Sequence, residues 1–160
     1  MSRIGPVLLF AVAVQAFCYG DVTKLSPEHR KALQDSKRFH EVRTTTNLPP
    51  AVVAFCADDN GRLAEPGQNW EPTDAIINSK FPRKRLIWAA TDGEYFVVHY
   101  ERGGIAHSFH ILIAELKPGN INSRVIWRGA GRELKDYKAF LVALDSNKLD
   151  AQAARLPLQF

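Results

Sequence analysis

The sequence predicts an α+β domain: an antiparallel meander sheet of about four strands, with an N-terminal and a C-terminal helix packed on one face. Three neighbouring stretches, 85–91, 94–101 and 105–116, are rich in β-branched and aromatic residues and are separated by short glycine-containing turns, which is typical of a meander. Residues 123–128 alternate like a fourth strand. Apolar residues at helical spacing then follow over 132–144.

The first twenty residues predict a secretory signal peptide outside the folded domain. A basic start at Arg3 precedes an uncharged apolar run (PVLLFAVAVQA) and small residues at signal-peptidase spacing, with cleavage expected after Gly20. A membrane anchor is the alternative, but the apolar run is shorter than the ~20 residues that a span requires. We therefore expect an exported chain, periplasmic or secreted, with one domain over 21–160 and no stable membrane span after cleavage.

Charge and cysteine content restrict the class of protein further. The chain has 21 basic and 17 acidic residues and a formal net charge of +4, which gives only a weak preference for anionic partners. Cleavage would leave Cys56 as the single cysteine, so the domain must rely on its hydrophobic core rather than on an internal disulfide. Within the sequence AFCA, Cys56 is expected to be a small buried residue rather than a reactive thiol.

The segment before the meander predicts two helices. Ser26 is a suitable N-cap, with Pro27 in the first turn, and the helix is expected to run to about Phe39 or Val42. Residues 51–57 follow two prolines and fit a short helix or a buried strand, of which we prefer the helix.

Two further segments are less regular. Residues 68–82 contain aromatic and apolar side chains without clear periodicity, so they are expected to wrap an edge of the sheet or to add a short strand. The sequence Gly-Ala-Gly at 129–131 is expected to end the fourth strand, and its GxG pattern alone is a weak signal for phosphate binding.

The turns of the meander predict its register. Asp92-Gly93 and Gly103-Gly104 are dipeptides that suit two-residue type I′ turns, and a fixed turn determines which residues face each other. The resulting pairs are Thr91 with Glu94, Trp88 with Val97, Glu101 with Ala106, His99 with Ser108 and Val97 with His110.

This register sorts the side chains into two faces. An apolar face is expected to receive the helices, and it also contains His107, which we interpret as a hydrogen-bonded edge residue. The other face combines aromatic and titratable groups. The apolar face comprises Ile87, Ala89, Phe96, Val98, Tyr100, His107, Phe109, Ile111 and Ile113. The mixed face comprises Leu86, Trp88, Tyr95, Val97, His99, Glu101, Ser108, His110 and Leu112.

The mixed face carries the candidate catalytic residues His99, His110 and Glu101. Two imidazoles on neighbouring strands, about 5–8 Å apart at Cβ and flanked by Glu101 and Ser108, can exchange roles as acid and base. The alternative is that both are solvated or hydrogen-bonded surface residues. No metal site and no cofactor are expected, because the HExxH and CxxC spacings are absent.

Aromatic and basic residues supply the candidate binding set. Guanidinium groups beside tryptophan and tyrosine can hold phosphate, an acidic polymer or an acidic protein surface. The alternative is a solubilising charged rim that protects a sheet edge. The candidate binding residues are Trp88, Tyr95, Ser108, Arg102, Arg128 and Trp70.

These observations favour a small exported, non-enzymatic domain that binds an unknown protein or a small anionic ligand, and an inhibitor-like role is a special case. The aromatic and arginine side chains are typical anchors of such contacts. The alternative is a small secreted hydrolase or ribonuclease-like phosphodiesterase that uses His99 and His110 as acid and base. Nucleic acid is a weaker partner class, and the sequence does not determine the oligomeric state.

Overall fold

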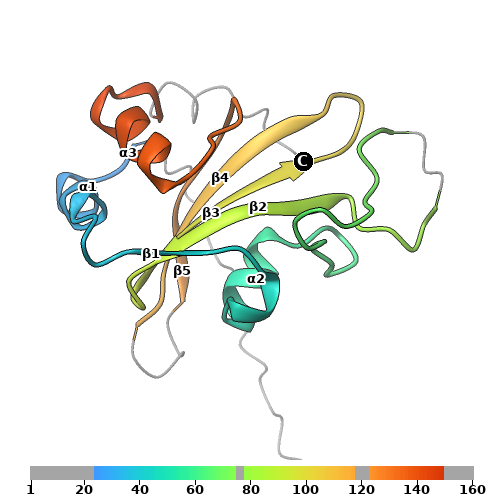
Figure 1. Ribbon diagram of the computed structural model, residues 1–160, viewed down its shortest axis with the longest axis horizontal. Helices are drawn as coiled ribbons and strands as arrows, with labels where there is room; N and C mark the ends of the chain where they lie inside the picture. The colour runs from blue at the N-terminus through green and yellow to red at the C-terminus, as the bar shows by residue number, and fades with distance from the viewer. Residues whose placement is uncertain (1–23, 75–77, 118–122, 150–160) are drawn as a thin grey trace, which may run out of the picture.

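The computed structural model describes residues 24–74, 78–117 and 123–149 and has the predicted α+β architecture. Five antiparallel strands form one sheet in the order β1-β2-β3-β4-β5, with helices packed against it (Figure 1). The strands are β1 (His40–Val42), β2 (Lys84–Thr91), β3 (Tyr95–Arg102), β4 (Ser108–Glu115) and β5 (Arg124–Gly131). The helices are α1 (Pro27–Gln34), α2 (Pro50–Cys56) and α3 (Tyr137–Asp145), with a 3-10 turn, η1, at Thr45–Asn47.

The start of α1 is confirmed, but its end is not. The Ser26 side chain accepts a hydrogen bond from the backbone of His29 at 3.1 Å, and Pro27 lies in the first turn. The helix ends at Gln34 rather than near Phe39 or Val42. The following residues form β1 instead, which pairs with the end of β2. This strand has only three residues and no local pattern, so its existence depends on a partner about fifty residues away.

The preferred helix over 51–57 is confirmed as α2, with Pro50 in its first turn. Its buried residues, Val52 and Cys56, face the sheet, and burial raises the pKa of the Cys56 thiol to about 12. The expectation of an inert buried cysteine therefore agrees with the structure.

The register of the meander differs from the prediction at both turns. Thr91 faces Phe96 instead of Glu94, because Asp92 Oδ1 accepts from the backbone of Glu94 and Tyr95 and holds a longer loop. A shift by two residues preserves the face of each side chain. A bulge between Leu86 and Trp88 then changes the face of the residues before it.

The second turn shifts the register by three residues, which turns β4 over. Glu101 faces Phe109 instead of Ala106. Gly103 does not form a type I′ turn; it lies against the backbone of Glu71, where an added Cβ would stand 1.8 Å from the Glu71 carbonyl oxygen. The described part of 68–82 agrees with the expectation that this segment wraps a sheet edge, because Glu71 makes this contact and Thr73 forms an isolated bridge with Gly104.

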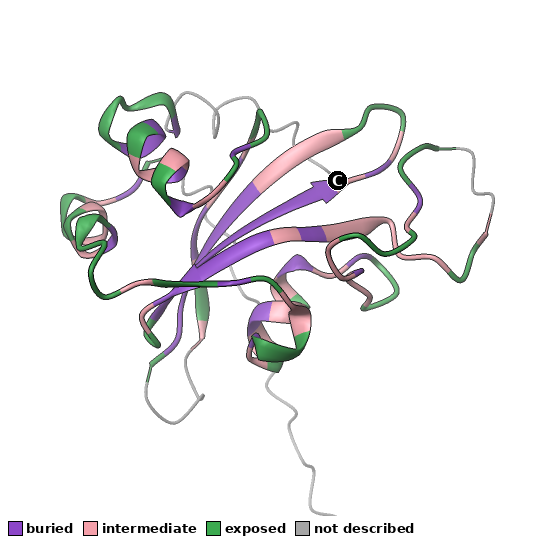
Figure 2. Cartoon of the chain, viewed as in Figure 1, coloured by how far each residue is buried: buried purple, intermediate pink, exposed green. Residues whose placement is uncertain are grey.

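Both faces of the sheet are buried, so the predicted division into an apolar face and a mixed face with titratable groups is wrong (Figure 2). One face packs against α1 and α3, and we call it the α1/α3 face. The opposite face packs against α2, and we call it the α2 face. Buried strand residues of the α1/α3 face are Trp88, Ala90, Tyr95, Val97, Ile111, Ile113, Ile126 and Trp127. Those of the α2 face are Leu86, Ala89, Phe96, Val98, Tyr100, Leu112 and Ala114.

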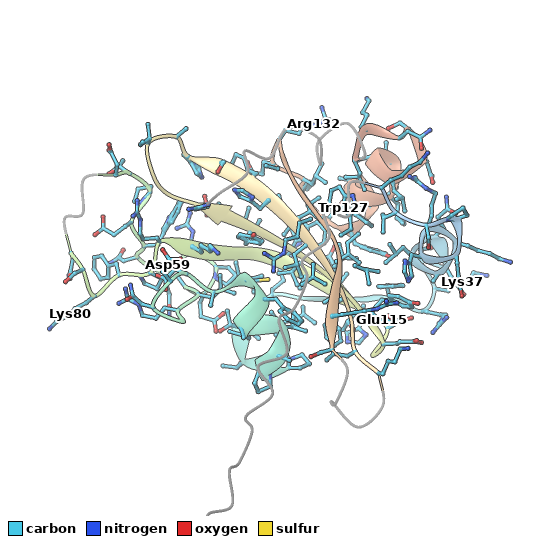
Figure 3. The ribbon with its side chains drawn as sticks, turned by 180° about the vertical axis from the view of Figure 1, so that it is seen from behind. Lys37, Asp59, Lys80, Glu115, Trp127 and Arg132 are labelled. Atoms are coloured by element: carbon cyan, nitrogen blue, oxygen red, sulfur yellow. The ribbon has the colours of Figure 1, made fainter. Side chains whose placement is uncertain are left out.

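Strand β5 extends through the Gly-Ala-Gly sequence that was expected to end it. Gly129 is required there because the Trp127 ring covers it, and an added Cβ would lie 2.2 Å from that ring. Trp127 itself is fully buried in the cluster formed with α1 and α3 (Figure 3). Helix α3 begins at Tyr137, five residues later than predicted, with Asp136 as its N-cap.

The signal peptide expected over 1–20 lies outside the described residues. Within the described ranges, no helix is long and apolar enough to cross a membrane.

Candidate functional site

A pocket of about 330 Å³ lies on the α1/α3 face, where β2 and β4 begin and β3 ends. Its walls come from these three strands, from the loop after α2 and from the loop before α3. The lining residues are Pro66, Gly67, Arg85, Leu86, Ile87, Glu101, His107, Phe109 and Glu133. Long-range strand pairing therefore assembles a site whose residues are dispersed along the sequence.

Glu101 is the central charged group of this pocket. Glu101 is only 6% exposed, and both of its carboxylate oxygens have partners. Oε1 accepts a hydrogen bond from Arg85 Nε at 2.6 Å, and Oε2 lies 2.8 Å from His107 Nε2. A buried carboxylate needs such partners to offset the loss of hydration. The pocket wall is thus held by a charge-assisted pair on one side and an imidazole on the other.

The bulge in β2 explains why Arg85 reaches Glu101. Without the extra residue, Arg85 and Trp88 would point to opposite faces, because they are an odd number of positions apart. The bulge at Ile87 places both on the α1/α3 face, and Arg85 then faces Glu101 in the register. A local irregularity of one strand therefore creates the ion pair.

His107 lies at the mouth of the pocket, with 41% of its side chain exposed. When His107 is neutral, the contact with Glu101 favours the tautomer in which Nε2–H donates to the carboxylate. The second nitrogen, Nδ1, is then an acceptor that a ligand can use. His107 was expected on the apolar face as a hydrogen-bonded edge residue; it is hydrogen-bonded, but it belongs to the pocket.

Aromatic rings support these polar groups. The Arg85 guanidinium lies 5.0 Å from the Trp70 ring, within the range of a cation–π contact. The His107 ring meets Trp70 edge-on at 5.3 Å and lies 4.9 Å from Phe109. Trp70 was a predicted binding residue, and the structure places it against Arg85 and His107.

His99 does not line this pocket, although it lies on the same face. It is fully buried: Nδ1 donates to the His110 carbonyl at 2.8 Å, and Nε2 accepts from the Leu134 backbone at 3.0 Å. Trp88 Nε1 donates to the carbonyl of the same Leu134 at 2.7 Å. We call this group, His99, Trp88 and Leu134, the Leu134 clamp. Burial lowers the pKa of His99, so the neutral ring is favoured.

His110 lies on the α2 face, so the structure separates the two imidazoles that the sequence grouped together. Its ring stacks on Tyr100 at 5.2 Å, and its Nε2 lies 2.8 Å from Ser108 Oγ. Burial, followed by the charges of Arg102 and Lys84, lowers the pKa of His110 to about 4. The register shift of three residues is the physical reason for the separation, and a shared His99–His110 relay does not form.

The other candidate residues divide among three places. Trp88 and Tyr95 are buried beneath α1 and α3, so neither presents an open surface. Arg102 and Arg128 belong to the α2 face, where an Arg128 amino group donates to the Phe55 carbonyl at 3.4 Å. Among the predicted site residues, Glu101 lines the pocket, and Trp70 contacts two lining residues, Arg85 and His107.

Arg85, Glu133 and Phe109 were missed as members of the pocket. Arg85 is the second residue of β2 and follows the basic residues Arg83 and Lys84, but only the bulge turns it toward Glu101. Glu133 was expected within a helix, whereas it lies in the loop that the Leu134 clamp holds. No sequence signal indicated that Arg85 would contact Glu101 or that Glu133 would lie at the pocket. Across the described ranges, no group of three or more His, Cys, Asp or Glu residues lies close enough to hold a metal ion.

Comparisons of this chain with protein-family models, with curated proteins and with solved structures found no match.

Proposed function

We propose that this chain is a small exported, non-enzymatic binding domain whose ligand occupies the pocket beside Glu101 and His107. The observation that carries the proposal is a buried carboxylate with both oxygens engaged, at the wall of an open pocket of about 330 Å³. A fixed polar group in a concave site of this size is typical of small-ligand recognition. The wall is organised before binding, which lowers the entropic cost of association.

The lining favours a ligand that offers hydrogen-bond donors and an apolar edge. His107 Nδ1 and the exposed Glu133 carboxylate are acceptors, while Arg85 is already engaged with Glu101 and with the Gln68 carbonyl. Ile87 and Phe109 add apolar surface. A small amine or polyhydroxylated molecule fits this chemistry.

A protein partner remains part of the proposal, including the inhibitor-like case. Ile105, at the tip of the loop between β3 and β4, is 96% exposed and lies two positions before His107. An exposed apolar side chain beside a polar pocket can serve as an anchor in a protein contact. The export proposal rests on the basic and apolar pattern of residues 1–20.

The pocket is tested by a ligand screen monitored by ¹H–¹⁵N NMR, with amines, polyols and organic anions as probes. We expect at least one probe to shift the amide signals of Glu101, His107 and Glu133 in a saturable way. His107→Ala should weaken this binding, whereas His40→Ala, which removes an exposed histidine of β1, should not. If the two variants bind the probe equally well, or if no probe shifts these signals, the proposed pocket is wrong.

A hydrolase or ribonuclease-like phosphodiesterase is the second candidate, and the His107–Glu101 contact favours it. In many enzymes a carboxylate orients an imidazole that acts as a general base. Here Nδ1 of His107 would take a proton from a water molecule, and that water would be the nucleophile. The assay uses RNA, phosphodiesters and esters with the wild-type chain and with His107→Ala. Activity that His107→Ala abolishes, and that His40→Ala leaves intact, would replace the non-enzymatic proposal.

A further inference from the structure

A row of three hydrogen-bond donors crosses the sheet on the α2 face, opposite the pocket. Lys84 faces Arg102 in the register of β2 and β3, and Arg102 faces Ser108 in that of β3 and β4. Directly opposed side chains point to the same face, with Cβ atoms about 4.5–5.5 Å apart. All three residues are partly exposed, so a ligand from solvent can reach the row.

Other contacts confirm that this row belongs to the α2 face. Lys84 Nζ donates to the carbonyl of Ala57, just after α2, and lies 5.6 Å from the centre of the Tyr100 ring. Tyr100 is buried in the cluster formed with α2. Ser108 bonds to His110, which stacks on the same Tyr100 ring.

The electrostatic environment of the row is positive. Burial, followed by the charge of Arg102, lowers the pKa of Lys84, and the charge of Arg128 acts in the same direction. Asp59 and Cys56 oppose this effect without reversing it. Because the cations destabilise one another, an anion at the row would relieve their repulsion.

The contact between Ser108 and His110 can direct a hydroxyl proton toward such an anion. Because the pKa of His110 is lowered to about 4, its ring is neutral at higher pH, and only one of the two ring nitrogens carries a proton. In the tautomer with this proton on Nε2, the ring donates to Ser108 Oγ at 2.8 Å. The Ser108 O–H is then directed to a different acceptor.

We propose that Lys84, Arg102 and Ser108 form a binding site for a small oxyanion of the phosphate or phosphomonoester class. Two cationic groups and one hydroxyl offer donors to three oxygens of such a group, and charge-assisted hydrogen bonds to phosphate are strong. The site is separate from the Glu101 pocket, because successive residues of β3 point to opposite faces. It goes beyond the proposed pocket and does not depend on it.

The test is a titration of the full chain with inorganic phosphate, followed by ¹H–¹⁵N NMR at constant ionic strength maintained with chloride. We expect saturable shifts at Lys84, Arg102 and Ser108. Arg102→Gln should weaken binding about tenfold or more, the size expected for a lost charge-assisted hydrogen bond. Lys37→Gln removes an equal charge from an exposed position between α1 and β1, which pairs with the far end of β2, and should change the affinity less than about twofold.

Ser108→Ala provides a second variant that removes one hydroxyl and no charge, in case Arg102→Gln does not fold. We expect about threefold weaker phosphate binding. The proposal is overturned if wild-type shifts do not saturate, if Arg102→Gln and Lys37→Gln weaken binding equally, or if Ser108→Ala binds phosphate as the wild type does. None of these outcomes affects the pocket, whose signals and variants are different.

Discussion

His99 and His107 lie on the same side of the sheet, yet they differ in every property that decides between structure and function. His99 is fully buried, and both of its ring nitrogens bond to backbone groups. His107 is 41% exposed, and one nitrogen contacts a carboxylate at a pocket. The difference shows that a histidine's partners, rather than its presence on a strand, indicate what it does.

The largest predicted effect is on the buried member of this comparison. His99→Ala leaves the Leu134 amide unsatisfied and opens a cavity in the core, so we expect the free energy of unfolding to fall by about 3 kcal/mol. Urea denaturation followed by circular dichroism measures this loss. His40→Ala, on the exposed edge of β1, is the control and should change stability by less than about 0.5 kcal/mol. Equal losses in the two variants would contradict the Leu134 clamp.

The second half of the clamp is tested by Trp88→Phe. This substitution retains an aromatic ring but removes the donor to the Leu134 carbonyl, which should cost about 2 kcal/mol. Combined with His99→Ala in a double-mutant cycle, the two losses should not add, because both residues hold the same backbone unit. Strict additivity would show that the two contacts are independent.

A smaller effect is expected from pH, through His110. Its pKa is lowered from 6.5 to about 4 in the folded chain by burial and by the charges of Arg102, Lys84 and His99, so the unfolded chain binds the proton more tightly. The resulting contribution to stability is fully present above pH 6.5 and is lost as the pH falls toward 4.

Urea denaturation across this range should show that loss in the wild type, with a smaller slope in His110→Gln. His99, whose pKa is also lowered, supplies part of the remaining slope. An unchanged slope in His110→Gln would mean that His110 is not buried as a neutral ring.

The smallest effect is expected at the exposed member of the comparison. His107→Ala should reduce the free energy of unfolding by less than about 0.5 kcal/mol, because His107 is exposed at the pocket mouth, so water can replace its contact with Glu101, while Arg85 still holds the other oxygen. Thermal unfolding of the variant beside His99→Ala gives the ranking directly. A loss at His107 comparable to that at His99 would show that the pocket histidine is structural as well.

Strand existence could be predicted from the sequence, but the contacts between strands could not. The β-branched and aromatic stretches predicted β2 to β5, and Ser26 and the prolines predicted where α1 and α2 begin. Gly103 suited a tight turn in sequence terms, but in the structure its lack of a side chain allows the close approach to Glu71. The register of β3 and β4 is shifted by three residues from the one that a tight turn predicts, which places His110 on the other face.

The prediction of the candidate site was limited for the same reason, because its contacts join segments that are far apart in the sequence. Glu101 and Trp70 could be identified by residue type, whereas the Arg85 contact depends on the bulge at Ile87, which has no local signal. Glu133 depends on the Leu134 clamp, which joins residues far apart in sequence. Turn dipeptides alone therefore predict neither the bulge nor the Leu134 clamp.

The most direct test of the difference between His99 and His107 is the tautomer of each ring, measured by long-range ¹H–¹⁵N NMR at a pH where both rings are neutral. We predict that His99 carries its proton on Nδ1, with Nε2 accepting from Leu134, and that His107 carries its proton on Nε2, facing Glu101. A His99 protonated on Nε2 would contradict the account, because that nitrogen could not accept from the Leu134 amide.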